Sequence, residues 1–276
     1  WAQVYVDVRE RIYNGVKVRE YSRAHISMIQ QIVEKYFIRW SQEDAGFNQF
    51  VQEEIIKVPI GRQSPIVEKF NKDYIYQFTD GSTILGDTAA KRMQKIHQLY
   101  SGTVKSEDGK GLVIDYSKAL YIRENYQGKK IAIYYCFIAE GDLLRKAFPN
   151  HTNDPAHFNS TGPDTVFISQ IQSGSMGVNL SAADYIIFYN IHFSSLLYWQ
   201  ARARMQSKDR TKDSIVHWIF TEGGIEEKIY KVVQQKKDYT TYYFRKDFDH
   251  GANQNTRAAV PGKSNQTPSR PGGVCR

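Results

Sequence analysis

The amino-acid sequence predicts an α/β protein: a parallel β-sheet with helices on both faces, preceded by a helical segment. The main observation is that, from Ser117 onward, short apolar runs alternate with segments of helical character. These runs are almost continuously apolar, which is typical of strands covered on both faces. Strands and helices that alternate at these lengths form βαβ units with parallel strands. A composition of 41% hydrophobic and 24% charged residues over 276 residues is sufficient for such a core.

The individual elements follow one another in this second part of the chain. The apolar runs predict strands at 129–137, 165–171, 185–190 and 214–220. Helices are expected at 140–148, 194–205 and 223–237. The last of these has Glu226 and Glu227 in its first turn and lysines at its end, which complements the helix dipole. Simple helix stabilisation is the preferred interpretation of those charges.

The first part of the chain has a different pattern. Residues 1 to about 56 are predicted to be helical, because apolar residues recur at steps of three and four between Ala24 and Trp40. A short strand is expected at 53–60, where Pro59 and Gly61 interrupt an apolar run. A further helix is expected at 87–102, with an aspartate at its start and a glycine at its end.

The net charge of +8 permits binding to nucleic acid without showing it. Part of the surplus lies in the last segment, which from His250 onward contains four basic residues and no acidic one. Residues 249–276 are rich in Gly, Pro, Asn and Ser and have few apolar residues, so they are predicted to form a disordered basic tail.

Several classes of protein are excluded. No apolar stretch approaches the roughly 18 residues of a membrane span, and the first residues do not resemble a secretory signal. Trp1 stands where an initiator Met is expected, so the sequence is interpreted as a fragment or a processed piece. Cys136 and Cys275 are the two cysteines, and the second lies in the tail, which argues against a disulfide framework. The sequence therefore predicts a chain without a membrane partner in a reduced, cytoplasmic setting.

The segment from Ser173 to Asp184 is the first candidate for a binding site. It follows the predicted strand 165–171, and in an open parallel sheet ligands bind at the carboxyl ends of the strands. Gly174 and Gly177 permit a close approach of the backbone, and Asn179 can donate a hydrogen bond to an oxygen. A loop whose glycines only satisfy turn geometry is an equally weighted alternative.

The segment from Tyr198 to Asp213 is the second candidate. Steps of four residues place Gln200, Arg204 and Lys208 on one face of a helix, with Arg202 nearly opposite. A basic surface helix is usually a solvated face, but the apolar residues before Gln200 indicate partial burial. Half-buried arginines need anionic partners, and phosphate matches the guanidinium fork.

The motifs that the chain lacks are equally informative. A phosphate-binding loop G-x-x-x-x-G-K-[ST], an Asp-Glu pair after a buried strand, zinc-type His/Cys spacing and G-x-S-x-G are all absent from the sequence. The sequence therefore predicts no metal site, and it predicts that the chain cannot turn over a nucleotide alone.

Together these segments resemble the second RecA-like lobe of superfamily 2 helicases, in the SWI/SNF-like branch and particularly its phage forms. Residues 173–184 are similar to helicase motif V. Residues 200–210 are similar to motif VI, with Gln200 and Arg204 at its Gln and first Arg positions. Residues 129–144 are similar to motif IV, Ser117-Lys118 to a Ser-x-Lys segment upstream of it, and 223–229 to a helix start typical of the family. The resemblance covers about 117–248.

The resemblance implies a domain organisation. Residues 1–60 correspond to the end of the first helicase lobe and its linker helices, 61–116 to a helical insertion between the lobes, and 117–248 to the second lobe. One position departs from the pattern. The second motif VI arginine falls at Ser207, with Lys208 and Arg210 nearby.

The resemblance also implies a function: the C-terminal half of an ATP-dependent translocase on duplex DNA. ATP and Mg²⁺ would be held mainly by a first lobe of the same polypeptide, outside this sequence. Arg204 would reach the γ-phosphate, with Gln200 and Lys208 assisting, and Gly177 and Asn179 would contact the nucleotide. Contacts to the DNA backbone would come from Ser173, Gly174 and Lys118. The location would be the cytoplasm, that of a bacterial host if a phage encodes the chain.

Two alternatives belong to other classes. The chain could be a nucleic-acid-binding or assembly module of the same fold without ATPase activity, which a first lobe lacking a phosphate loop and a DExx pair would favour. A Rossmann-type enzyme using a dinucleotide or a methyl donor is a third interpretation. It requires G-x-G-x-x-G after the first strand, which this sequence does not have.

Overall fold

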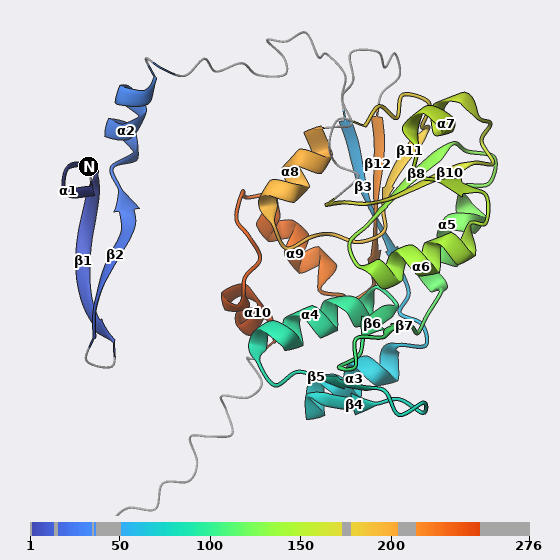
Figure 1. Ribbon diagram of the computed structural model, residues 1–276, viewed down its shortest axis with the longest axis horizontal. Helices are drawn as coiled ribbons and strands as arrows, with labels where there is room; N and C mark the ends of the chain where they lie inside the picture. Colours follow the sequence, from blue (N-terminus) through green and yellow to red (C-terminus); the bar gives the residue numbers. More distant parts are fainter. Residues whose placement is uncertain are drawn as a thin grey trace, which may run out of the picture. The chain divides into compact units, whose positions relative to one another are not determined.

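Figure 1 shows the protein as a computed structural model, which describes residues 2–13, 16–34, 36, 51–172, 178–203 and 214–248. The chain divides into two compact units, Trp1–Asn48 and Gln49–Arg276. Within the described ranges, no helix is long and apolar enough to cross a membrane. The predicted basic tail, 249–276, lies outside the described residues.

The first unit is built around an antiparallel hairpin. Strands β1 (Val6–Tyr13) and β2 (Val16–Ala24) pair with an irregularity between Asp7 and Arg9. Helix α1 (Ala2–Tyr5) precedes them and α2 (Ile26–Val33) follows them. The helical prediction for residues 1–56 is therefore correct at α2 and wrong for the hairpin. Apolar and charged residues alternate along both strands, which is a strand pattern, and Asn14-Gly15 between them is a hairpin signal.

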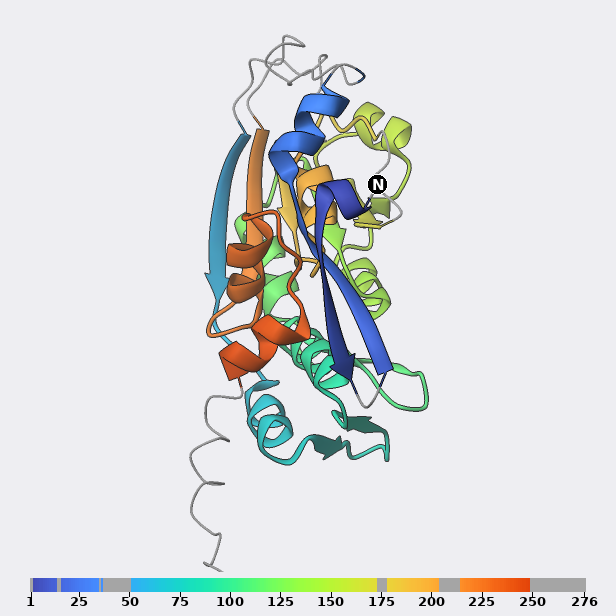
Figure 2. The same ribbon diagram turned by 90° about the vertical axis from the view of Figure 1, so that its left-hand side faces the viewer.

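The second unit contains a six-stranded parallel sheet in the order β3-β12-β11-β8-β10-β9. Its strands are β3 (Val51–Val58), β8 (Ile131–Tyr135), β9 (His151–Thr152), β10 (Val166–Gln170), β11 (Tyr185–Phe188) and β12 (Ser214–Thr221). The predicted α/β class with a parallel sheet is confirmed. Figure 2 shows β3 and β12 side by side at one edge of the sheet, where they pair over the whole length of both strands.

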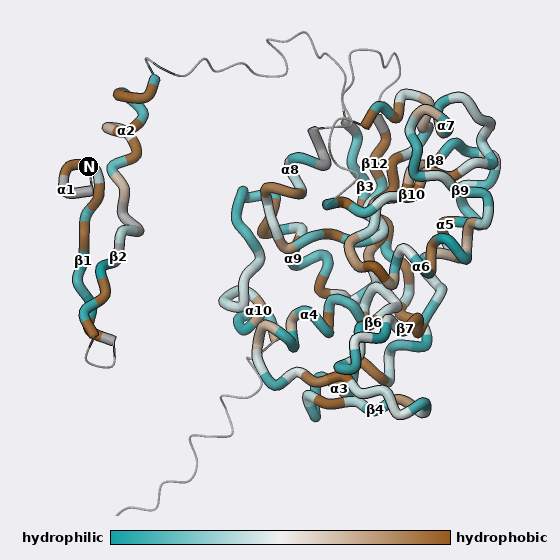
Figure 3. The backbone as a smooth tube through the Cα atoms, viewed as in Figure 1, coloured by the Kyte–Doolittle hydropathy of each residue, from teal (hydrophilic) through white to brown (hydrophobic). Residues whose placement is uncertain are grey.

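Side chains of the central strands alternate between two apolar cores, as expected for a sheet covered on both faces. Ile131 and Ile133 of β8 point to the core that includes α5 (Ser117–Asn125) and α6 (Ile138–Ala147). Ala132 and Tyr134 point to the opposite core. That core includes residues of α7 (Pro155–Ser160), α8 (Ser195–Ala203), α9 (Glu226–Val233) and α10 (Thr241–Phe248). In Figure 3 brown, hydrophobic stretches run along the central strands, among them β10 and β12.

The segment between β3 and α5 belongs to the same unit. It contains α3 (Ser64–Asp73), the hairpin β4 (Ile75–Gln77) and β5 (Thr83–Leu85), α4 (Ala89–Tyr100), and the hairpin β6 (Thr103–Lys105) and β7 (Gly111–Val113). Its buried residues Phe70, Ile96 and Leu99 share one core cluster with the sheet. The helical insertion between the lobes predicted at 61–116 stays a prediction; the segment contains two hairpins besides its helices and packs its apolar side chains against the sheet.

Helix α4 is the element of this segment that the sequence predicts well. The cap is Thr88 rather than the expected Asp87: the Thr88 hydroxyl accepts from the Lys91 N–H at 3.2 Å, and Asp87 pairs with the Lys91 ammonium at 2.9 Å. After the helix, Gly102 has a φ of +84°, and a Cβ there would lie 2.6 Å from the Asp115 carbonyl oxygen. This glycine is thus required where the chain leaves α4.

Candidate functional site

The predicted site residues lie in two consecutive connections of the sheet, from β10 to β11 and from β11 to β12. The loop that contains Ser173, Gly174 and Gly177 follows the carboxyl end of β10. Helix α8 connects the parallel neighbours β11 and β12, so it runs back against the strands and ends toward the start of β12 (Figure 1). These three residues, together with Arg204 and Lys208, lie outside the described residues. The structure therefore describes what leads into both segments.

Asn179 and Gln200 are described and both are exposed. The Asn179 side-chain oxygen accepts a hydrogen bond from the Ser181 N–H at 2.9 Å, and its carbonyl accepts one from the Asn159 amide at 2.9 Å. These bonds shape a turn within the predicted motif V segment. Gln200 lies on α8 near the end of the helix. Asn179 lies before β11, and Gln200 lies on the helix that follows that strand.

Lys118 is not available to DNA, and its prediction as a nucleic-acid contact is wrong. Its side chain is 3% exposed, and its ammonium lies 3.4 Å from a Glu226 carboxylate oxygen and 4.7 Å from the centre of the Tyr189 ring. A phosphate contact requires an accessible ammonium. The lysine instead connects the start of α5 to the start of α9 across 108 positions of sequence.

Glu226 and Glu227 are neighbours in opposite environments. Glu226 is fully buried, and burial raises the pKa of its carboxyl group although Lys118 opposes that shift. Glu227 lies on the surface, 3.0 Å from the Lys57 ammonium and 3.2 Å from that of Lys231, and these lysines lower its pKa. The preferred interpretation of both charges as helix stabilisation thus fits Glu227 better than Glu226, which carries a long-range contact.

A second buried carboxylate, Glu140, lies at the ends of β8 and β11. One of its oxygens accepts hydrogen bonds from the N–H groups of Cys136 and Phe137 at 2.8 and 3.0 Å. The other accepts from the Asn190 side-chain amide at 2.6 Å. Burial raises the pKa of Glu140, and these donors oppose the shift. The carboxylate fixes the turn from β8 into α6 and holds the residue that follows β11.

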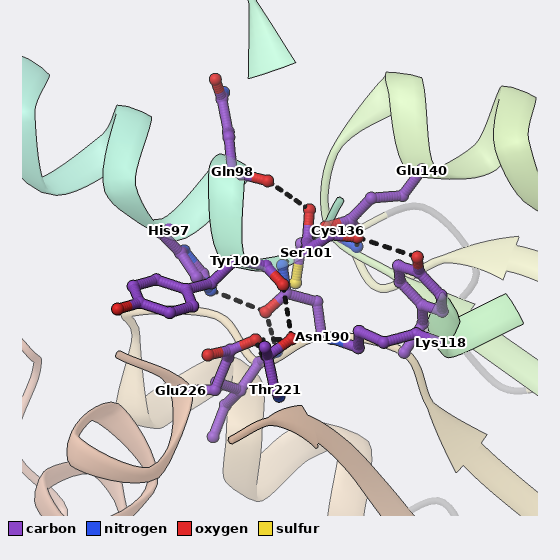
Figure 4. A network of polar contacts seen from close by, with 12 residues as sticks. His97, Gln98, Tyr100, Ser101, Lys118, Cys136, Glu140, Asn190, Thr221 and Glu226 are labelled. Atoms are coloured by element: carbon purple, nitrogen blue, oxygen red, sulfur yellow. Dashed lines mark hydrogen bonds and ion pairs between the residues drawn. The ribbon is translucent and has the colours of Figure 1, made fainter. Parts of the chain in front are cut away.

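The side chain of Asn190 is also hydrogen-bonded to His97 of α4 (Figure 4). Because the Asn190 amide nitrogen donates to Glu140, its oxygen must accept, from the Ile191 N–H at 2.8 Å and from His97 Nε2 at 2.6 Å. His97 therefore carries its proton on Nε2. Burial lowers the pKa of His97 to about 3, so the ring is neutral.

These five residues form one buried structure, called here the edge network: His97, Lys118, Glu140, Asn190 and Glu226. It ties α4, α5, α6 and α9 to the carboxyl edge of the sheet, and the Thr221 hydroxyl adds a 2.5 Å bond to the Tyr100 carbonyl of α4. Sequence analysis named Lys118 and Glu226 in other roles and missed the contacts that join these residues. The available signal was a polar residue directly after a buried strand, as at Asn190, because the ends of parallel strands meet at one edge.

A pocket of about 610 Å³ opens beside the edge network. Aromatic side chains, Phe137 and Phe193, and amide side chains, Gln98 and Gln170, contribute to its walls. Gln172, the last described residue before the predicted motif V loop, also lines it. Among the described residues no group of three His, Cys, Asp or Glu side chains could hold a metal ion. The walls of the pocket thus combine aromatic faces with amide groups that can donate and accept hydrogen bonds.

Comparisons with known proteins agree on the kind of domain. No protein-family model matches the chain. A 99-residue segment is 34% identical to Helicase SWR1 of Candida glabrata, over 32% of this chain and 7% of that protein. An 86-residue segment is 34% identical to the chromatin-remodeling ATPase INO80 of Gibberella zeae, over 31% of this chain and 4% of that protein. The crystal structure of the C-terminal part of the Fun30 ATPase domain matches with a TM-score of 0.54 and 13% identity, covering 73% of this chain and 96% of that one.

The chain thus resembles the C-terminal part of the Fun30 ATPase domain in fold, and it resembles segments of a helicase and of a chromatin-remodeling ATPase in sequence. These two relatives are a helicase and a chromatin-remodeling ATPase, both from fungi, and neither is a phage protein. The matched segments span 4–7% of the length of these relatives.

Proposed function

We propose that this chain is the second RecA-like lobe of an ATP-dependent DNA translocase and works together with a first lobe of the same polypeptide. The observation that supports this most strongly is that the sequence matches and the structural match point to the same kind of protein. A third of the chain aligns with a helicase at 34% identity, and nearly three quarters of it follows the fold of the C-terminal part of an ATPase domain. The motif resemblances fall in the same order along the chain.

The proposed roles of the two segments follow the motif resemblance. The loop after β10, with Ser173 and Gly174, would grip the DNA backbone, and Gly177 and Asn179 would contact the nucleotide. The segment after α8 would place Arg204 at the γ-phosphate of an ATP–Mg²⁺ complex held by the first lobe, with Gln200 and Lys208 assisting. An arginine at that position neutralises the charge that develops during phosphoryl transfer. The exposed side chain of Gln200 is consistent with a partner outside this lobe.

The test of this proposal is Arg204→Ala in the complete polypeptide. ATP and DNA binding should stay nearly intact while kcat falls by about 10³–10⁵-fold, because an arginine finger acts mainly in the transition state. Arg202→Ala is the matched control on the opposite side of the helix and should have a mild effect. Lys208→Ala and Arg210→Ala show whether either base replaces the arginine missing at Ser207. Normal turnover by a stably folded Arg204→Ala variant would contradict the motif VI assignment.

The 276-residue chain by itself should not hydrolyse ATP, since it has no phosphate-binding loop. It should bind duplex DNA without sequence preference and with an affinity that falls steeply with salt. Titrations with unrelated duplexes at two salt concentrations check this, and a chain ending at Phe248 separates the lobe from the basic tail. Binding by a complete polypeptide that never hydrolyses ATP would favour the alternative, a binding or assembly module of the same fold.

The phage origin and the host-cytoplasm location belong to the same proposal. Reading the flanking genes tests both, together with the presence of a first lobe. A flanking region that encodes a phosphate-binding loop and a DExx pair among phage genes is the expected result.

A further inference from the structure

Glu53 of β3 gathers hydrogen bonds from three other elements. One of its carboxylate oxygens accepts from the hydroxyl of Tyr198 on α8 at 3.1 Å, from the indole N–H of Trp218 on β12 at 3.2 Å, and from the hydroxyl of Tyr230 on α9 at 3.2 Å. The three donors lie 145, 165 and 177 positions from Glu53 in the sequence. These four residues are called here the Glu53 cluster.

The donors are deeply buried while the acceptor keeps contact with water. Tyr198, Trp218 and Tyr230 are 3%, 1% and 9% exposed, whereas Glu53 is half-buried. The three rings also pack on each other, with centres 5.5–5.8 Å apart. A buried hydroxyl or indole N–H without a partner destabilises the fold, and an ionised carboxylate is a stronger acceptor than a neutral group. One side chain of β3 therefore satisfies a polar atom in each of three elements.

Helix α8 is held at three points along its length. At its start, the Asp238 carboxylate accepts from the N–H and the hydroxyl of Ser195 at 2.8 and 2.9 Å. On one side, the Trp199 indole donates to the Val233 carbonyl at 3.1 Å. The bond from Tyr198 to Glu53 ties the helix to the first strand of the sheet. This last contact fixes how far the helix is rotated about its own axis, because it pins a long side chain at its tip.

The rotation of α8 decides where the side chain of Gln200 points. Two residues along a helix correspond to about 200° of rotation, so holding Tyr198 inward keeps Gln200 on the outward side. Gln200 is in fact exposed. Since β3 is the strand by which the chain enters this unit, the same contact connects the entering segment to the helix.

We propose that Glu53 is a positioning residue, which sets the orientation of α8 and thereby of Gln200 and the segment that carries Arg204. This inference rests on the proposed function for its effect on ATP turnover, but its structural part stands alone. Glu53 touches neither ATP nor DNA in this scheme. It acts through Tyr198.

The test compares two substitutions of identical chemistry, Tyr198→Phe and Tyr230→Phe. Each removes one hydroxyl that donates to the same Glu53 oxygen, but only Tyr198 lies on α8. In the 276-residue chain, hydrogen exchange of the amides of α8 should become about tenfold faster in Tyr198→Phe and stay near the wild-type rate in Tyr230→Phe. In the complete polypeptide, Tyr198→Phe should lower kcat about tenfold at an unchanged KM for ATP, which a general loss of stability would not do.

Substitutions at Glu53 complete the test. Glu53→Ala should accelerate the exchange of α8 and lower kcat more than Tyr198→Phe does. Glu53→Gln keeps an acceptor oxygen, so both quantities should stay close to their wild-type values. Glu54→Ala is the matched control, because this neighbour points to the other face of the sheet, 61% exposed and 3.5 Å from His217.

Unchanged exchange of α8 in Tyr198→Phe, or equal acceleration in Tyr230→Phe, would overturn the proposal. Faster exchange with an unchanged kcat in an active polypeptide would overturn it as well. If the wild-type polypeptide does not hydrolyse ATP, the proposed function fails, and the exchange comparison still decides whether Glu53 orients α8.

Discussion

The edge network and the Glu53 cluster solve the same problem in different ways. Each joins elements that are far apart in sequence through polar contacts inside an apolar core. In the edge network two carboxylates, Glu140 and Glu226, are completely buried, and burial raises the pKa of both. In the Glu53 cluster the carboxylate is half-buried and its partners are neutral aromatic donors.

This difference in burial separates contacts that stabilise the whole unit from contacts that orient single elements. A fully buried charge that loses its partner has no water to replace it, so its loss should destabilise the whole unit. A half-buried carboxylate keeps part of its hydration. When it is removed, water can reach the donors that it leaves behind, so the structure changes only locally. We therefore expect large effects on stability at the edge network and smaller, more local effects at the Glu53 cluster.

The largest effect is expected from Lys118→Met. This change leaves the buried Glu226 carboxylate without its ammonium partner, and the free energy of unfolding should fall by about 3–5 kcal/mol. Denaturant unfolding at neutral pH measures it, with the exposed Lys129→Met as control. The double variant Lys118→Met/Glu226→Leu should recover much of the loss, because an apolar pair replaces the ion pair. A single-variant loss below about 1 kcal/mol would refute the distinction between the two centres.

The second effect is a pH dependence that comes from His97. In the unfolded chain this residue binds a proton near the ordinary histidine pKa of 6.5, whereas burial in the folded chain lowers its pKa to about 3. Lowering the pH from 6.5 therefore favours the unfolded state, by up to about 1.4 kcal/mol per pH unit, until the pH reaches the folded pKa. His97→Gln removes this titration and keeps an amide donor for Asn190.

The measurement is the difference in unfolding free energy between the wild type and His97→Gln from pH 7 to 4. Glu140 and Glu226 have raised pKa values in the folded chain, so their contribution to the stability of the fold decreases as the pH rises above 4.5. This dependence on pH is opposite to that of His97. Their contribution is common to both proteins and cancels in the difference. A difference that does not change with pH would contradict a neutral, buried His97.

A smaller effect is expected from Glu53→Ala. The three donors lose their common acceptor, but water can reach the half-buried position, so the free energy of unfolding should fall by about 2 kcal/mol. Denaturant unfolding of the same chain checks this value. A loss as large as that of Lys118→Met would place Glu53 among the contacts that hold the fold.

The smallest effect is expected from Glu227→Gln, because the Glu227 side chain is 35% exposed, whereas that of its neighbour Glu226 is buried. The two lysine partners of Glu227 lie on the surface, where ion pairs contribute about 0–1 kcal/mol and are screened by salt. Its unfolding midpoint should stay close to that of the wild type, and raising the salt concentration should reduce the remaining difference. A large loss of unfolding free energy in Glu227→Gln would mean that the place of a carboxylate in the first turn of α9 matters more for stability than its burial.

The sequence determined much of this fold because the relevant signals are local. Four apolar runs predicted β8, β10, β11 and β12, and a capped apolar stripe predicted α4, since strand and helix periodicities extend over a few neighbouring residues. The same reasoning failed at β1 and β2, where period-two alternation and Asn14-Gly15 were outweighed by the helical period that follows. Both signals were present in the sequence.

Only the tertiary structure decided which polar residues are inside. Lysine is a residue type that usually lies on the surface, and the carboxylate that pairs with the buried Lys118, that of Glu226, lies 108 positions away in the sequence. The strand at Val51–Val58 was expected outside the lobe, yet it pairs with β12 and brings Glu53 to donors at least 145 positions away. Burial and hydrogen bonding of such residues depend on where distant segments meet, and no local pattern of spacing or hydropathy encodes that meeting.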